Sequence, residues 1–156
     1  MRVLVWSGLV LILDQLTKQI IRVNLDLHKS IRVIGDNILI THVENPGIAF
    51  GINIQGGSLL FMIASLLATA LIFLYLWRWR NASLLIRISL ALILGGAFGN
   101  LTDRFIFGKV VDFIQIGAGG WYWPVFNVAD SAVTIGMILF LYLSFFRQNK
   151  DAPELA

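Results

Sequence analysis

The sequence predicts an all-α membrane protein with four transmembrane helices and a small β-sheet cradle in the first long loop. Of its 156 residues, 58% are hydrophobic and 13% are charged, whereas a soluble domain carries about 25% charged residues. Four apolar segments are each long enough for a span of roughly 20 residues. The polar stretch between the first two segments contains alternating β-branched residues, which favour a hairpin.

The four spans are expected at residues 3–21, 58–77, 84–101 and 125–146, within one integral membrane domain covering 1–156. The first apolar run continues through Asp14 and Lys18, so it predicts a retained helix rather than a cleaved signal peptide. The second span carries no charge and ends in Trp-Arg-Trp-Arg, a sequence typical of a membrane interface. In the third span, Gly95, Gly96 and Gly99 favour close approach of a neighbouring helix.

The longest polar connection, residues 22–56, predicts a small sheet on the membrane surface. Between Ile31 and Val43, β-branched residues flank the turn sequence Gly-Asp-Asn, which indicates a hairpin. The sequence Asn-Pro-Gly, starting at Asn45, marks a second turn, and a further strand is expected to reach Ile54. We expect His42 to be an ordinary surface residue, because no other histidine or carboxylate has the spacing of a metal site.

Positive charge decides the orientation only weakly. With the N-terminus in the cytoplasm, six of the 12 lysine and arginine residues fall on each side of the membrane. The dense basic charge of the short 78–83 loop and of both tails favours this orientation. It places the loops 22–56 and 102–124 on the extracytoplasmic side.

Polar residues are expected to gather at one membrane depth, because successive spans run in opposite directions. Spans one and three carry theirs toward their C-terminal ends, and span four carries its own at its N-terminal end. The converging residues are Asp14, Asn45, Asn100, Asp103, Asp112, Asn127 and Asp130. Ionisable groups at membrane depth cost roughly 2.5–3.5 kcal/mol each on insertion scales, so this concentration indicates a functional site.

Two of these carboxylates lie in unlike environments and can act as an acid and a base. Asp112 is flanked by apolar residues, which should raise its pKa, whereas Asp130 lies near a helix N-terminus, where the dipole favours an ionised carboxylate. Such a pair suits peptide hydrolysis with water. A small proton-coupled transporter would use the same carboxylates, and a non-catalytic lipid-binding or partner-binding module is a third interpretation. For Asp103 and Arg104, a structural charge pair is the simpler interpretation.

Several other classes fit the sequence poorly. The absence of cysteine excludes disulfides, thiolate metal sites and cysteine nucleophiles. Neither a Gly-x-Ser-x-Gly elbow, a His-Glu-x-x-His helix nor a Walker-type loop is present. We therefore expect no cofactor and no metal, although a metal site made of carboxylates alone stays open. The formal charge of +3 is spread over the loops, so no nucleic-acid partner is expected.

Five ordered motifs closely resemble the lipoprotein signal peptidase family, also called signal peptidase II. They are LeuAspGlnLeuThrLys (13–18), GluAsnProGlyIleAlaPheGly (44–51), GlyGlyAlaPheGlyAsnLeuThrAspArg (95–104), GlyLysValValAspPhe (108–113) and PheAsnValAlaAsp (126–130). The motifs follow one another along nearly the whole chain, and the four-span plan agrees with the family. Their number and order make the resemblance specific.

The resemblance implies an aspartyl endopeptidase of the bacterial cytoplasmic (inner) membrane. It would remove the signal peptide from diacylglyceryl-modified prolipoproteins by cutting before the lipidated cysteine. By motif position, Asp112 and Asp130 would form the catalytic dyad. The residues that would hold substrate or orient the dyad are Asp14, Asn45, Asn100, Arg104 and Asn127, with Asp103 in a structural role.

The resemblance also implies the setting of the enzyme. Its partners would be prolipoprotein signal peptides and membrane lipids, it would act as a monomer without a cofactor, and its site would face the extracytoplasmic side. The loop 22–56 would cradle the substrate, and residues 105–125 would form a mobile cover over it.

Overall fold

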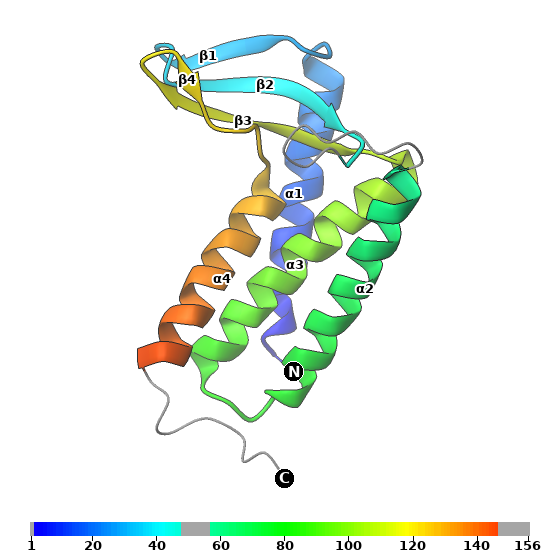
Figure 1. Ribbon diagram of the computed structural model, residues 1–156, viewed down its shortest axis with the longest axis vertical. Helices are drawn as coiled ribbons and strands as arrows, with labels where there is room; N and C mark the ends of the chain where they lie inside the picture. The colour runs from blue at the N-terminus through cyan, green and yellow to red at the C-terminus, as the bar shows by residue number, and fades with distance from the viewer. Residues whose placement is uncertain (1, 48–56, 147–156) are drawn as a thin grey trace.

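A computed structural model describes residues 2–47 and 57–146, and it places a four-stranded sheet at one end of four long helices (Figure 1). The helices are α1 (Leu4–Asn24), α2 (Gly57–Arg78), α3 (Leu84–Phe107) and α4 (Val128–Phe146). Each is long and apolar enough to cross a membrane. The predicted class, a mainly helical four-span membrane protein with a small sheet, is confirmed.

Two helix ends differ from the expected spans, and both differences bear on the site. Helix α3 continues past Leu101 to Phe107, so Asp103 and Arg104 lie in the helix rather than in a loop. Gly108 ends it with a left-handed conformation (φ 71°), and its N–H donates to the Arg104 carbonyl at 3.0 Å. Helix α4 begins at Val128 instead of residue 125.

The predicted hairpin is confirmed, but the sheet draws on both loops. Its antiparallel strands lie in the order β1 (Ser30–Ile34), β2 (Ile38–Asn45), β3 (Val110–Ala118) and β4 (Trp121–Tyr122). The sheet is therefore not confined to residues 22–56, as the sequence suggested. Much of the segment expected to be a mobile cover forms paired strands, because β3 finds backbone partners on β2. The expected strand through Ile54 lies outside the described residues.

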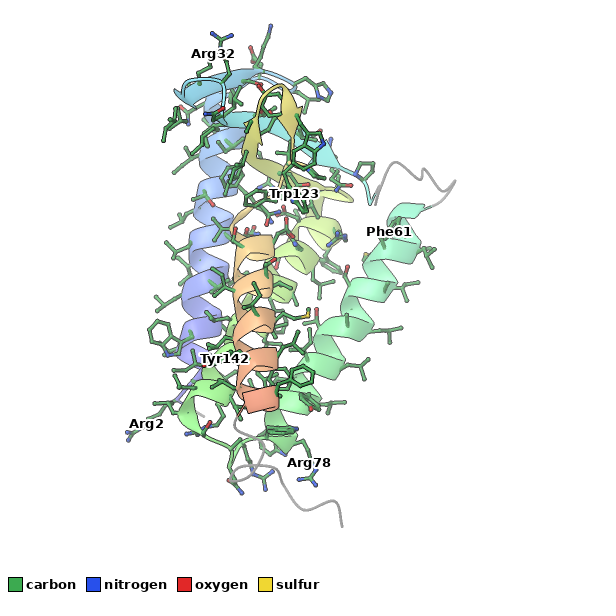
Figure 2. All side chains as sticks on the ribbon, turned by 60° about the vertical axis from the view of Figure 1, so that its left-hand side comes forward. Arg2, Arg32, Phe61, Arg78, Trp123 and Tyr142 are labelled. Atoms are coloured by element: carbon green, nitrogen blue, oxygen red, sulfur yellow. The ribbon has the colours of Figure 1, made fainter. Side chains whose placement is uncertain are left out.

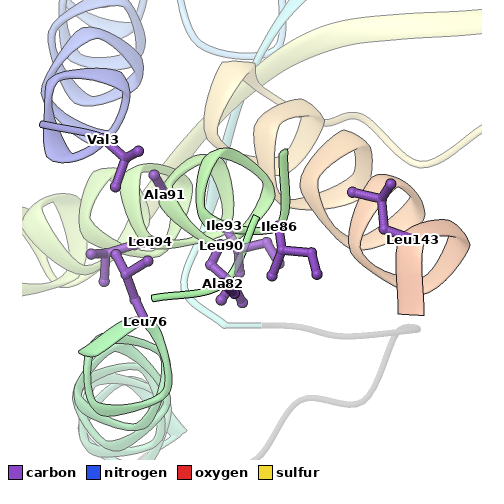
Figure 3. Packing of buried hydrophobic residues seen from close by; sticks show 9 residues of the cluster. All are labelled: Val3, Leu76, Ala82, Ile86, Leu90, Ala91, Ile93, Leu94 and Leu143. Carbon is purple, nitrogen blue, oxygen red and sulfur yellow. The ribbon is translucent and has the colours of Figure 1, made fainter. Parts of the chain in front are cut away.

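Helix α3 is the centre of the helical bundle. Half of the apolar stretch of α3 is buried inside the protein, against 11% of that of α2. Away from the sheet, it packs with the other three helices around a cluster of apolar side chains (Figure 3), which are Val3, Leu76, Ala82, Ile86, Leu90, Ala91, Ile93, Leu94 and Leu143. The predicted close approach at the glycines is confirmed, since a Cβ at Gly95 would lie 2.8 Å from the Ser7 carbonyl oxygen.

Helix α2 diverges from the rest of the bundle toward the sheet. Figure 2 shows its Phe61 end standing away from the other helices, whereas its Arg78 end lies close to them. At the Arg78 end, Tyr75 of α2 and Trp79, which directly follows the helix, pack against Phe140 of α4, with ring centroids 5.9 and 6.2 Å away. The divergence leaves a groove between α2, α3 and α4 on the side of the sheet.

Candidate active site

The first turn of α4 is built by a reciprocal cap between Asn127 and Asp130. Asn127 Oδ1 accepts the backbone N–H of Asp130 at 2.9 Å, and Asp130 Oδ2 accepts the backbone N–H of Asn127 at 3.2 Å. This arrangement is a capping box, which satisfies two N–H groups that the helix itself leaves unpaired. The spacing of three residues in the sequence therefore places both side chains at the head of α4.

Asp112 reaches the same point from the sheet. It lies on β3 opposite Val43 of β2 and is 5% exposed. Its Oδ1 accepts the Asn127 side-chain amide at 2.7 Å, and its Oδ2 accepts the Asn45 amide at 3.3 Å. Burial, and secondly the nearby charge of Asp130, raise the pKa of Asp112 from 3.8 to about 7, although both amide donors oppose this shift.

Asn100 of α3 connects Asp130 to the interior. Its Nδ2 donates to Asp130 Oδ1 at 2.7 Å, and its Oδ1 accepts the Asn127 amide at 3.2 Å. Asn127, which has no exposed surface, thus contacts both Asp112 and Asp130 as well as Asn100. The two candidate carboxylates are held together by one asparagine.

Asp14 approaches from α1 and caps α4 from outside. Its Oδ1 accepts the backbone N–H of Ala129 at 2.9 Å, and its Oδ2 lies 2.8 Å from the Lys18 ammonium. Neither Asp14 nor Lys18 is exposed. The buried carboxylate therefore has both a cationic partner and a helix N-terminal donor, which oppose part of its desolvation cost.

Asp103 of α3 contacts both α1 and β3, and its partners are not the expected ones. It pairs with Lys18 at 3.1 Å and Arg22 at 2.9 Å, and it also accepts the backbone N–H of Val111 at 3.2 Å. The suggested charge pair with Arg104 is wrong. Asp103 and Arg104 are neighbours along the helix, so they point 100° apart, and the Asp103 side chain faces α1 instead.

Arg104 faces the groove between α2, α3 and α4. Its Nη1 donates to the Asn100 carbonyl of its own helix at 3.2 Å, and its buried Nε lacks a hydrogen-bond partner. The groove has a volume of about 360 Å³. Its lining residues are Ser65, Ala68, Thr69, Ile72, Ile93, Ala97, Asn100, Arg104, Asp130, Val133, Thr134 and Met137.

The convergence expected from the alternating span directions is confirmed by these contacts. Residues from α1, β2, α3, β3 and the head of α4 meet in one hydrogen-bonded network. Gln15 and Arg22 were not predicted as site residues, and Lys18 was named only as part of the first apolar run. The Gln15 amide donates to Asp103 at 3.1 Å, and the spacing of Asp14 and Lys18 by four residues was the available signal.

His42 is wrongly predicted to be a surface residue. It is buried on β2, and its Nδ1 lies 2.7 Å from the Leu25 carbonyl oxygen. The segment after α1 pairs with β2 at this residue, since the His28 N–H donates to the His42 carbonyl at 2.8 Å and the His42 N–H donates to the Lys29 carbonyl at 3.0 Å. Over residues 2–47 and 57–146, no group of three or more histidine or carboxylate side chains is arranged to hold a metal ion.

Fold and site together define a multi-pass membrane protein whose polar site, with two linked carboxylates, lies at the head of a groove between its spans. A family model described as signal peptidase (SPase) II matches residues 6–146. The chain belongs to the signal peptidase II family, and it is accordingly a protease. This membership decides against the transporter and against the non-catalytic module.

The chain is similar over most of its length to bacterial proteins named lipoprotein signal peptidase. It is 43% identical over 153 residues to the protein of Syntrophus aciditrophicus, covering 95% of this chain and 94% of the relative. The protein of Desulforapulum autotrophicum is 42% identical over 151 residues, covering 93% and 92%. That of Pseudomonas aeruginosa is 39% identical over 147 residues, covering 92% and 86%.

Two solved structures, both described as a bacterial membrane enzyme studied by the in meso method, share the fold. One has a TM-score of 0.81 at 33% identity, covering 97% of this chain and 94% of its own. The other has a TM-score of 0.79 at 32% identity, covering 99% and 94%. Because the relatives are bacterial, the membrane in question is the bacterial inner membrane.

Proposed function

We propose that this protein removes signal peptides from diacylglyceryl-modified prolipoproteins, cutting before the lipidated cysteine with Asp112 and Asp130 as its acid–base pair. The observation that carries the proposal is the bridge made by Asn127. Its side-chain amide contacts Asp112 at 2.7 Å and its backbone N–H contacts Asp130 at 3.2 Å, at the head of a membrane groove. The relatives named lipoprotein signal peptidase supply the substrate class.

The two carboxylates have environments that suit different roles. The raised pKa of Asp112, about 7, suits the protonated partner. Asp130 lies in the first turn of α4, where the helix dipole favours the anion, and it accepts two N–H groups. Asp130 is therefore the base and Asp112 the acid.

Hydrolysis then needs no covalent intermediate. Asp130 takes a proton from water, the water oxygen bonds to the scissile carbonyl carbon, and Asp112 gives its proton to the carbonyl oxygen. The resulting tetrahedral diol returns one hydroxyl proton to Asp112, while Asp130 gives its proton to the leaving nitrogen and the C–N bond breaks. Each aspartate ends in its starting state. General acid–base help of this kind is typically worth ~10²–10⁴ in rate.

The groove is suited to the apolar part of a signal peptide. It runs from Ile72 and Met137, deep in the span, to Asn100, Arg104 and Asp130 at its upper end. An apolar segment lying along it would bring its polar end to the carboxylates. The Arg104 guanidinium lines the groove at this point, and its buried Nε has no hydrogen-bond partner.

The whole chain 1–156 acts as one membrane peptidase domain, a monomer in contact with membrane lipids, without a cofactor. Its site faces the extracytoplasmic side, with Asp14, Asn45, Asn100, Arg104 and Asn127 orienting the dyad or holding substrate and Asp103 supporting them.

The test is cleavage of a diacylglyceryl-modified lipobox peptide by purified protein in detergent. Asp112→Asn and Asp130→Asn are expected to stay folded by thermal unfolding and to lose at least 100-fold in kcat. Asp36→Asn, at an exposed position in the turn between β1 and β2, is the matched control and should cleave as wild type does. Activity near the wild-type level in either dyad variant would remove that residue from the mechanism, and an inactive wild type would refute the proposed function.

A further inference from the structure

Lys18 is fully buried, and its ammonium has three acceptors. Asp14 Oδ2 lies at 2.8 Å, Asn100 Oδ1 at 2.9 Å and Asp103 Oδ2 at 3.1 Å. An ammonium has three N–H donors and no acceptor, so each donor is used. Two of the three contacts are ion pairs, and the third joins Lys18 to the amide beside the proposed dyad.

That third contact decides which way the Asn100 amide points. Because an ammonium can only donate, the amide atom that faces it must be the oxygen. Asn127 Nδ2 donates to the same oxygen at 3.2 Å, which favours the same orientation. The Asn100 nitrogen is consequently turned to the other side, where it donates to Asp130 Oδ1 at 2.7 Å.

The orientation of this amide selects a protonation state. An N–H directed at a carboxylate oxygen stabilises the ionised form. With the amide reversed, its oxygen would face Asp130, and two acceptors can share a hydrogen bond only if the carboxyl carries a proton. We propose that Lys18 is a positioning residue that acts through Asn100 to hold Asp130 as the ionised member of the dyad. This inference rests on the proposed function of Asp112 and Asp130.

Several charged groups surround the site, and Lys18 is the one whose contact with the Asn100 side chain carries the inference. Asp14 of α1 and Asp103 of α3 face the ammonium, and Arg22 of α1 pairs with Asp103. Arg104 of α3 lines the groove together with Asp130 of α4. Asp112 of β3 is the remaining charged group of the site, where it contacts Asn45 and Asn127.

The test compares Lys18→Met with Arg22→Met in the lipopeptide assay, with kcat followed from about pH 3, below the ordinary aspartate pKa of about 3.9, to about pH 8. The acid limb is the part of this profile in which kcat falls as the pH is lowered. Both substitutions remove one cation from the same cluster. Lys18 donates a hydrogen bond to the Asn100 side chain, whereas Arg22 forms its ion pair with Asp103. For Lys18→Met, the acid limb should move up by about one pH unit, so kcat should fall by up to about tenfold at pH values below the wild-type limb and should change little well above it. For Arg22→Met, the acid limb should keep its wild-type position.

The inference is overturned if the acid limb of Lys18→Met stays in place, or if both variants move it equally. Because Lys18→Met leaves a buried carboxylate unpaired, a second comparison avoids dependence on its folding. Asp14→Asn and Asp14→Asn/Lys18→Met both retain the Asp103–Arg22 pair, and the double variant should still move the acid limb up relative to the single one. Coinciding limbs in these two variants would equally overturn the inference.

The same assay separates this inference from the proposed function. If Asp130→Asn cleaves like wild type, the dyad itself is wrong and the role of Lys18 falls with it. If wild type is active, Asp130→Asn is inactive and Lys18→Met leaves the acid limb of the pH profile unchanged, only the positioning role of Lys18 is refuted.

Discussion

Asp14 Oδ2 lies 2.5 Å from the place that a Cβ on Gly99 would occupy. The α1 and α3 helices are so close at this level that no side chain fits between the glycine and the carboxylate. This closeness allows Asp14 to reach across to the Ala129 N–H at the head of α4, 2.9 Å away. Contact among α1, α3 and α4 at the site therefore requires a residue without a side chain at position 99, which Gly99 provides.

Gly99→Ala is expected to destabilise the protein and reduce cleavage together. The added methyl must displace the buried carboxylate, at a cost of about 1–3 kcal/mol for overpacking. Thermal unfolding in detergent and the lipopeptide assay would measure both effects. Gly8→Ala is the matched control, because a Cβ at Gly8 has no neighbour within 4 Å. Equal melting temperatures for the two variants would contradict the prediction.

The stability of the protein should fall as the pH rises through the titration of Asp112. Its pKa is raised from 3.8 to about 7, so between these values the folded protein binds more protons than the unfolded chain. Unfolding is then favoured as pH increases, by up to about 4 kcal/mol in total. Asp112→Asn removes this dependence, and it should unfold at a higher temperature than wild type at pH 8.

Melting curves at pH 5 and pH 8 would check this, and the gap between variant and wild type should be wider at pH 8. Asp36→Asn serves as the control because Asp36 is 73% exposed. Parallel behaviour of wild type and Asp112→Asn at both pH values would show that Asp112 does not titrate as the structure indicates.

Asn127→Leu should abolish cleavage and also weaken the fold. Asn127 has no exposed surface and contacts Asp112, Asp130 and Asn100. Leucine fills a similar volume but leaves buried polar partners unsatisfied, at a cost of ~1–3 kcal/mol each. We expect at least a 100-fold loss in kcat together with a lower melting temperature. Asn24→Leu, at the exposed end of α1, should change neither; full activity in Asn127→Leu would exclude the bridging role.

Phe140→Ala should separate stability from catalysis. Phe140 packs edge-on against Tyr75 and Trp79 at the bundle end away from the site. Lipid is as apolar as the protein interior, so the loss is mainly packing and aromatic contact, about 1–3 kcal/mol. We expect a lower melting temperature with unchanged kcat below the transition. Phe145→Ala, at a side chain that is 72% exposed, should leave both unchanged; a reduced kcat in Phe140→Ala would show that packing at this end is coupled to the site.

Much of the architecture could be read from the sequence because it depends on local physics. Twenty-residue apolar runs predict spans, since a helix satisfies its own backbone hydrogen bonds in lipid. The Gly35–Asn37 turn predicted the β1–β2 hairpin for the same local reason. The sheet was only half predicted, because the pairing of β2 with β3 joins strands from separate loops.

By itself, the sequence determined that this is a four-span membrane protein in which Asp14, Asp103, Asp112 and Asp130 converge, because apolar length and alternating span direction are local properties of the chain. Only the tertiary structure decided which polar groups touch. Lys18 and Asn100 are 82 positions apart, and Asp103 pairs across to α1 rather than with its neighbour Arg104. Such contacts depend on how each helix is rotated about its axis and how closely it packs, and close packing at glycines such as Gly99 sets both.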